Sequence, residues 1–194
     1  MYTYKRTIKS GDMIEVEYYQ SIRKIGKNYG GRKSNNSLSP AKMRKANKLR
    51  AVKHMQRLIN ANFGSGDFFC RFSAPYGTYE TEEEFRKEVG KWLYRINYRL
   101  KKQGKGRLKY IAFIECGKSG KNWHIHIIVS KEDRELLSEQ WPYENGQNFT
   151  PLYKNENFKK LAEYITKDLT GKEDVDAAQK RMMTSCLLYT SPSP

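Results

Sequence analysis

The sequence predicts an α+β protein in which an antiparallel sheet is flanked by helices. Two observations support this class. Strand-like runs joined by short turns alternate along the chain with runs of helical periodicity. Hydrophobic residues make up 38% of the 194 residues and aromatic residues 13%, enough for one core or at most two small ones. We therefore expect a folded protein rather than a disordered one.

The N-terminal third is predicted to form a strand, a loop and a helix. Residues 13–22 alternate in polarity as a strand does, and residues 27–38 form a loop rich in Gly, Asn and Ser. Ser39 and Pro40 provide a helix start, and the helix is expected to run to about Asn60. Its loose apolar stripe consists of Met43, Leu49, Val52, Met55 and Ile59.

The middle of the chain carries the clearest helix signal. Residues 64–75 indicate a turn followed by a buried strand, within which lies FFCRFS, residues 68–73. Thr81 and Glu84 form a capping box, and Gly104 is expected to end the helix. Between them, apolar residues recur at helical spacing: Phe85, Val89, Leu93, Ile96 and Leu100.

The last predicted elements are a hairpin and two helices. Residues 108–117 and 123–130 form two strands joined by a Gly-rich turn, which indicates a β-hairpin. A short helix capped by Ser130 follows, and residues 158–169 form an amphipathic helix ended by Gly171. We expect a core over residues 67–185, preceded by a basic segment over residues 1–66 that packs on it.

The net charge of +16 indicates a polyanionic partner. From Tyr18 to Gly66 the chain contains twelve Lys and Arg residues and neither Asp nor Glu. A run this long favours phosphate contact over a merely solvated face, and Lys42, Lys45 and Lys48 of the predicted helix are the candidates. The sequence shows no apolar run of membrane-spanning length and no secretion signal, so we expect a cytoplasmic protein without a membrane partner.

The final nine residues, 186–194, have a different origin in our interpretation. CLLYTSPSP matches the translation of a transposon-end adapter used to prepare sequencing libraries. We therefore expect the native sequence to stop near Ser185 and the natural C-terminus to be missing.

The hairpin carries a candidate metal site. On a strand, alternate side chains share a face, so His124 and His126 point the same way, about 7 Å apart. Glu115 on the preceding strand can lie beside them. Two imidazoles and a carboxylate form a three-ligand site with open positions, which suits Mn²⁺ or Mg²⁺. An H-x-H pair by itself is better explained as two half-buried sheet histidines.

The predicted C-terminal helix carries a candidate nucleophile. Tyr164 lies off the apolar stripe of that helix, with Lys160 and Lys167 on its side of the helix. Neighbouring positive charge favours the phenolate, which is the nucleophilic form. Taken alone, the pattern is better explained as a surface tyrosine in a lysine-rich protein.

The sequence W-His124-I-His126 with upstream Glu115, followed by Tyr164-I-T-Lys167, resembles the HUH endonucleases. Among them it is similar to the single-tyrosine rolling-circle replication initiators of plasmids and phages, including the gene-II-type proteins of filamentous phages. FFCRFS stands where that family has its first strand motif. The resemblance covers residues 67–170 and implies an RRM-like palm whose central hairpin carries the metal ligands.

This resemblance also implies a mechanism. His124, His126 and Glu115 would bind the metal, Tyr164 would attack the scissile phosphate of single-stranded or hairpin origin DNA, and Lys167 would assist. Arg71 and Lys160 are expected to contact the DNA, and a host helicase and polymerase to complete replication in a bacterial cytoplasm.

Other functions remain open at this stage. One is a non-catalytic module that binds single-stranded nucleic acid on an aromatic sheet. A conjugative relaxase or a single-tyrosine transposase would use the same chemistry in another process.

Overall fold

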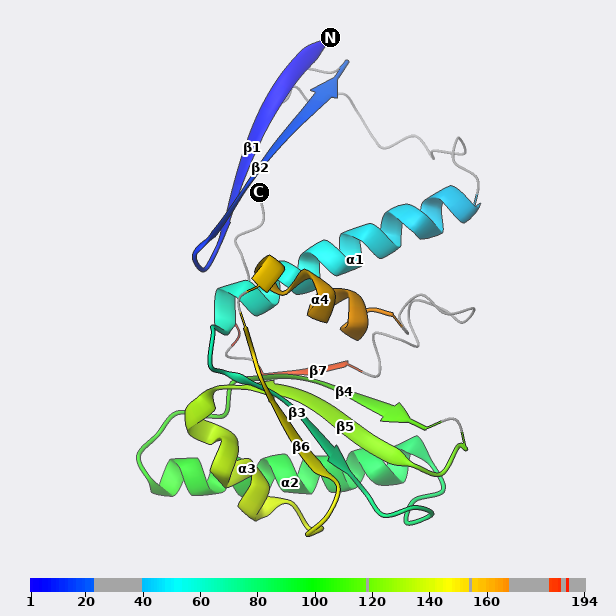
Figure 1. Cartoon of the computed structure of the whole chain (residues 1–194), viewed down its shortest axis with the longest axis vertical. Coiled ribbons are helices and arrows are strands. Elements are labelled where there is room, and N and C mark those ends of the chain that lie inside the picture. The colour runs from blue at the N-terminus through cyan, green and yellow to red at the C-terminus, as the bar shows by residue number, and fades with distance from the viewer. Residues whose placement is uncertain (23–39, 118, 154, 168–181, 186–187, 189–194) are drawn as a thin grey trace, which may run out of the picture.

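A five-stranded antiparallel sheet has helices on both faces, and a two-stranded ribbon lies beyond one helix layer (Figure 1). The computed structural model describes residues 1–22, 40–117, 119–153, 155–167, 182–185 and 188. The strands are β1 (Tyr2–Ser10), β2 (Met13–Ser21), β3 (Phe68–Ser73), β4 (Tyr110–Cys116), β5 (Trp123–Val129), β6 (Gln147–Pro151) and β7 (Met182–Thr184). The helices are α1 (Pro40–Asn62), α2 (Glu82–Lys102), α3 (Arg134–Gln140) and α4 (Lys159–Ile165), with 3₁₀ turns at Lys131–Asp133 and Asn155–Phe158.

The strand order in the large sheet is β6-β3-β5-β4-β7, so the predicted hairpin of β4 and β5 lies at its centre. This confirms the α+β class and the central hairpin. In β5 every residue after Trp123 is buried, because helices cover both faces. The edge strands β6 and β7 were not predicted.

One core layer lies between the sheet and helices α2 and α3. Its sheet side includes Phe72, Ile125 and Ile127, and the buried face of α2 includes the predicted apolar stripe together with Trp92. The capping box is confirmed, since Glu84 N–H donates to Thr81 Oγ1 at 3.3 Å. Gly104, at a φ of 68°, follows the end of α2 in the left-handed conformation that favours glycine.

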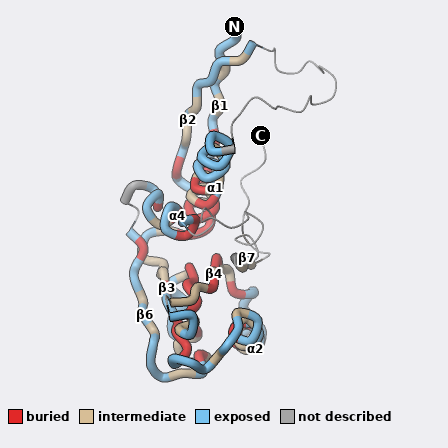
Figure 2. Tube along the Cα trace, turned by 90° about the vertical axis from the view of Figure 1, so that its right-hand side faces the viewer, coloured by how far each residue is buried: buried red, intermediate tan, exposed pale blue. Residues whose placement is uncertain are grey.

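A second core layer lies between the opposite sheet face and helices α1 and α4. Figure 2 shows buried residues along the strands of the sheet and on the C-terminal half of α1. There, Met55 and Ile59 pack with Ile128 of β5. The N-terminal half of α1 extends away from the sheet (Figure 1). Met43 and Leu49, predicted as part of the apolar stripe, are therefore 48% and 60% exposed.

Two helix ends differ from the prediction. The side chain of Ser130 makes no capping bond; instead, Asp67 Oδ1 accepts a hydrogen bond from Lys131 N–H at 3.0 Å. Helix α4 ends at Ile165 rather than at residue 169. At this end, the N–H and the hydroxyl of Thr166 both donate to the Ala162 carbonyl, at 3.0 and 2.7 Å.

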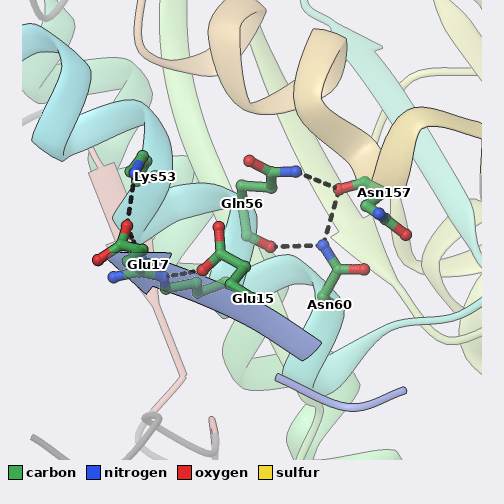
Figure 3. A network of polar contacts seen from close by, with 7 residues as sticks. Glu15, Glu17, Lys53, Gln56, Asn60 and Asn157 are labelled. Carbon is green, nitrogen blue, oxygen red and sulfur yellow. Dashed lines mark hydrogen bonds and ion pairs between the residues drawn. The ribbon is translucent and has the colours of Figure 1, made fainter. Parts of the chain in front are cut away.

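Strands β1 and β2 form a ribbon that packs on α1. The prediction contained β2 but missed β1. Lys53 Nζ contacts Glu17 at 2.6 Å and Arg57 Nε contacts Glu15 at 2.5 Å (Figure 3). These two basic residues of the acid-free segment therefore pair with the ribbon, and the expectation of phosphate contact does not hold for them.

The turn of the ribbon approaches α1 closely. Gly11 has a φ of +59°, and a Cβ atom there would collide with the carbonyl oxygen of Asn60. Only glycine fits both the backbone conformation and the contact.

Some predicted features lie outside the described residues: the loop at 27–38, the cap at Ser39, the stop at Gly171, and Arg23, Lys24, Lys27, Arg32 and Lys33. Of residues 186–194, only Leu188 is described. Among the described residues, no helix combines the length and apolar character needed to cross a membrane.

Candidate active site

The pairing of β4 with β5 brings Glu115 and the two histidines together. Glu115 is directly opposite His124 in the antiparallel register, and His126 follows on the same face. Glu115 Oε2 lies 3.2 Å from His124 Nε2 and 3.0 Å from His126 Nε2. One donor atom from each residue lies within 4.8 Å of the others, so the three side chains converge on one point.

The histidine hydrogen bonds are compatible with metal coordination. His124 Nδ1 lies 3.1 Å from the Asn122 carbonyl, which can only accept, so the Nδ1–H donates and the Nε2 lone pair faces Glu115. His126 Nδ1 is buried and has no hydrogen-bond partner within the described part of the chain. Burial is the main cause that lowers the pKa of His126 to about 3, and the neighbouring His124 imidazole and Arg71 guanidinium add to it. The imidazole is therefore neutral at ordinary pH, as a metal ligand must be.

Two imidazole nitrogens and one carboxylate fit a divalent metal ion. Three protein donors leave coordination positions open, as substrate-binding metal centres require. This arrangement confirms the predicted grouping of Glu115, His124 and His126.

Helix α4 brings Tyr164 to this cluster. The Tyr164 hydroxyl lies 3.5 Å from His126 Nε2, and the two rings meet edge to face with centroids 5.7 Å apart. Tyr164 is 44% exposed, so the residue is accessible from solvent. A residue distant in sequence thus lies within hydrogen-bonding reach of a metal-ligand candidate.

Two phenylalanines that the sequence analysis did not assign complete the surroundings of His126. Phe69 of β3 and Phe113 of β4 stack on its ring, with centroids 5.3 and 4.8 Å away. Both also contact the ring of Tyr164 edge-on. By strand alternation, Phe113 lies on the same face of its strand as Glu115, and Phe69 lies on the same face as Arg71. This alternation is the sequence signal that could have identified both phenylalanines as neighbours of the cluster.

The start of α4 is fixed by α1. Asn157 and Phe158, just before the helix, both have positive φ values of 49° and 59°. The Asn157 carbonyl accepts hydrogen bonds from Gln56 Nε2 at 3.0 Å and from Asn60 Nδ2 at 2.7 Å (Figure 3). These bonds hold the left-handed turn from which α4, and with it Tyr164, projects.

Among the other predicted site residues, Arg71 belongs to the strand beside the histidines. It is opposite His126 in the β3–β5 register, and its Nε–H donates to Ser73 Oγ at 3.0 Å. Lys160 is an exposed residue of α4. Lys167 lies beyond the helix end, where its N–H donates to the Tyr164 carbonyl at 3.1 Å.

Lys42, Lys45 and Lys48 belong to a different region of the surface. All three are exposed on the N-terminal half of α1, the half that extends away from the sheet (Figure 1). The structure therefore separates these lysines from the Tyr164 cluster.

The family comparison covers the part of the chain that contains this cluster. The sequence model described as replication-associated protein ORF2/gene II protein matches residues 77–173, half of the chain. This range includes Glu115, His124, His126 and Tyr164. The searches of curated proteins and of solved structures found no match. The chain belongs to the replication-associated protein family of the ORF2 and gene II proteins.

Proposed function

We propose that the protein is an HUH endonuclease that initiates rolling-circle replication by nicking single-stranded or hairpin origin DNA with Tyr164. Membership of a replication-associated family supports DNA as the partner. The observation that carries the chemistry is the 3.5 Å approach of the Tyr164 hydroxyl to His126 Nε2. This distance supports the proposal, because phosphoryl transfer to a side chain needs a hydroxyl oxygen beside a site suited to a metal ion.

His124, His126 and Glu115 would hold the metal ion, for which we propose Mn²⁺ or Mg²⁺. When bound, the ion supplies Lewis-acid polarisation of the scissile phosphate. The protein would contribute the orientation of its ligands: the Asn122 carbonyl fixes the tautomer of His124, and Phe69 and Phe113 each pack against the ring of His126.

In the proposed step, the Tyr164 oxygen attacks phosphorus in line with the P–O3′ bond. The Oη–P bond forms as the P–O3′ bond breaks, and the departing oxygen takes up a proton to become a 3′-hydroxyl. The phenolic proton passes to solvent, to which the side chain is 44% exposed. The products are a 5′-phosphotyrosine and a primer end. Because one phosphate ester replaces another, a 3′-hydroxyl can reverse the reaction and rejoin ends without ATP.

Basic residues around the cluster would orient the DNA and offset its charge. Arg71 projects from the face that carries the histidines, where its guanidinium can bind a phosphate. Lys167 follows α4 directly and would support the negative charge of the transition state. Lys160 would contact the backbone from α4. A host helicase and polymerase would extend the primer in the bacterial cytoplasm.

Covalent trapping tests the proposal. The wild-type protein is incubated with Mn²⁺ and a random-sequence single-stranded library labelled at the 3′ end, so that the labelled fragment remains attached through its 5′ phosphate. We expect a labelled adduct that survives a denaturing gel. Tyr164→Phe removes only the hydroxyl and should abolish the adduct while preserving DNA binding.

Tyr153→Phe is the matched control, because Tyr153 is 66% exposed and precedes α4. This variant should form the adduct at the wild-type level. Labelling of Tyr164→Phe would disprove the choice of nucleophile. Binding of the library without cleavage by the wild-type protein would indicate a non-catalytic binding module instead.

A further inference from the structure

The ribbon of β1 and β2 has two faces with different chemistry. The register pairs Lys5 with Tyr18 and Lys9 with Ile14, so these residues point to one face, and Glu15 and Glu17 point to the other. We call the face with Lys5 and Lys9 the outer face. It consists of Thr3, Lys5, Thr7 and Lys9 of β1 and Ile14, Val16, Tyr18 and Gln20 of β2.

The inner face is occupied by α1. Ile8 and Met13 on this face are each only 8% exposed. Glu15 and Glu17, which are the acidic residues of the two strands, pair with Arg57 and Lys53 of α1. The ion pairs of Glu15 and Glu17 thus attach the ribbon to the rest of the protein.

The outer face is exposed along its whole length. Ile14, Val16 and Tyr18 form an apolar row that is 63%, 47% and 69% exposed. Lys5 and Lys9 run beside this row on β1, and neither strand places an acidic residue on this face. A contiguous apolar row on a solvent face marks an interaction surface, and the uncompensated lysines indicate an anionic partner.

The shape and residue types favour duplex DNA. Two strands about 4.8 Å apart fit the major groove, which is about 12 Å wide and admits a two-stranded ribbon. Lys, Thr and Gln can contact base edges and phosphates, and aliphatic side chains can contact thymine methyl groups. A single-stranded partner would be stacked on several aromatic rings, whereas the outer face carries Tyr18 as its one aromatic residue.

We propose that the outer face of the β1–β2 ribbon binds in the major groove of duplex DNA. Nine residues per strand span about 30 Å, close to one turn of the double helix. The ribbon extends past α1, on the side away from the large sheet (Figure 1). It therefore forms a second DNA-binding surface, distinct from the Tyr164 cluster. The biological meaning of this assignment rests on the proposed function, since a nickase that acts on origin DNA must also bind the flanking duplex.

Salt-dependent binding tests this surface. A labelled mixed-sequence duplex, without metal ion, is titrated with the wild-type protein and with Lys5→Gln/Lys9→Gln at several salt concentrations. The slope of log Kobs against log salt should become shallower by about 1.8, or about 0.9 for each phosphate that is no longer neutralised. The control pair Lys87→Gln/Lys101→Gln changes exposed residues of α2, on the opposite side of the sheet, and should leave the slope unchanged.

A second variant tests the apolar row. Val16→Glu places a carboxylate between Ile14 and Tyr18 and should weaken duplex binding at least tenfold, with a smaller effect on a single strand of the same sequence. Equal weakening for both probes would overturn the groove assignment, as would an unchanged salt slope in the lysine variant. A wild-type dimer in sedimentation that Val16→Glu dissociates would instead make the outer face a contact between copies.

The two proposals fail in distinguishable ways. If the wild-type protein forms the Tyr164 adduct but Lys5→Gln/Lys9→Gln keeps the wild-type slope, only the ribbon assignment is wrong. If the wild-type protein forms no adduct and the slope falls as expected, the nicking function is wrong and the duplex-binding surface stands.

Discussion

The side-chain amide of Asn60 donates a hydrogen bond to the main-chain carbonyl of Asn157 at 2.7 Å, across 97 residues of sequence. This bond joins the end of α1 to the left-handed turn before α4. Asn60 is 7% exposed and also donates to the Gln56 carbonyl at 2.9 Å. It thus acts on Tyr164 indirectly, as a positioning residue.

Asn60→Ala should slow formation of the Tyr164 adduct roughly tenfold or more, because a small displacement of α4 misaligns the nucleophile. Removal of these hydrogen bonds should also lower stability by about 1–3 kcal/mol. Mn²⁺ affinity, measured by calorimetry, should remain at the wild-type value because the metal ligands lie on β4 and β5. Asn47→Ala, an exposed change on α1, is the control. Wild-type adduct kinetics in Asn60→Ala would refute the positioning role.

A second prediction concerns the candidate metal site. His124→Ala, His126→Ala and Glu115→Ala should each abolish Mn²⁺-dependent nicking and reduce Mn²⁺ binding, because each removes one of three converging donors. Calorimetry and the denaturing gel measure the two effects, and circular dichroism checks the fold. His54→Ala is a matched control, since His54 is the remaining histidine and lies exposed on α1. Nicking at the wild-type rate by either cluster histidine variant would disprove the metal site.

Lys167 should assist the reaction without being essential. Lys167→Ala is expected to slow single-turnover cleavage by roughly 10- to 100-fold, because a positive charge beside the transition state is removed while the nucleophile remains. Lys167→Arg keeps the charge and should recover most of the rate. Lys159→Ala, which alters an exposed lysine at the start of α4, should have little effect. A complete absence of adduct in Lys167→Ala would mean that this residue does more than supply charge.

The lysines of α1 should contribute sequence-independent phosphate contacts. Replacing Lys42, Lys45 and Lys48 together with Gln should weaken single-stranded DNA binding and reduce its salt slope by about 2, or about 0.7 for each phosphate. The α2 control pair, Lys87 and Lys101, serves here as well. An unchanged slope would show that these three lysines do not contact DNA phosphates.

The elements that the sequence predicted are those with local signals. The capping box of Thr81 and Glu84 lies within four residues and defines the start of α2. The strands carrying Glu115 and His124 are adjacent in sequence, so their pairing follows from a short turn. Alternation alone placed His124 and His126 on one face, and the structure confirms it.

The features that the sequence did not reveal depend on distant partners. Strand β6 contains few apolar residues and forms because β3 offers its edge. Met43 and Leu49 are exposed because the N-terminal half of α1 extends away from the sheet. Helical periodicity contains no information about where the sheet ends. The stacking of Phe69 and Phe113 on His126 requires three strands to be in register. In the sequence, Lys53 and Arg57 cannot be distinguished from the neighbouring basic residues, because the carboxylates that pair with them lie on the ribbon.

The candidate site combines residues of one hairpin with Tyr164 of a separate helix, and this has a consequence for folding. Glu115 and His126 are 11 residues apart, whereas Tyr164 lies 38 residues beyond His126. A β-hairpin closes early because its loop is short, whereas α1 is hydrogen-bonded to the turn before α4 across 97 and 101 residues of sequence. A nascent or partly opened chain would therefore hold Glu115, His124 and His126 together while Tyr164, the proposed nucleophile, lies away from them. Amide hydrogen exchange should show α4 opening before β4 and β5, so that the proposed nicking activity is lost first on unfolding and gained last on folding.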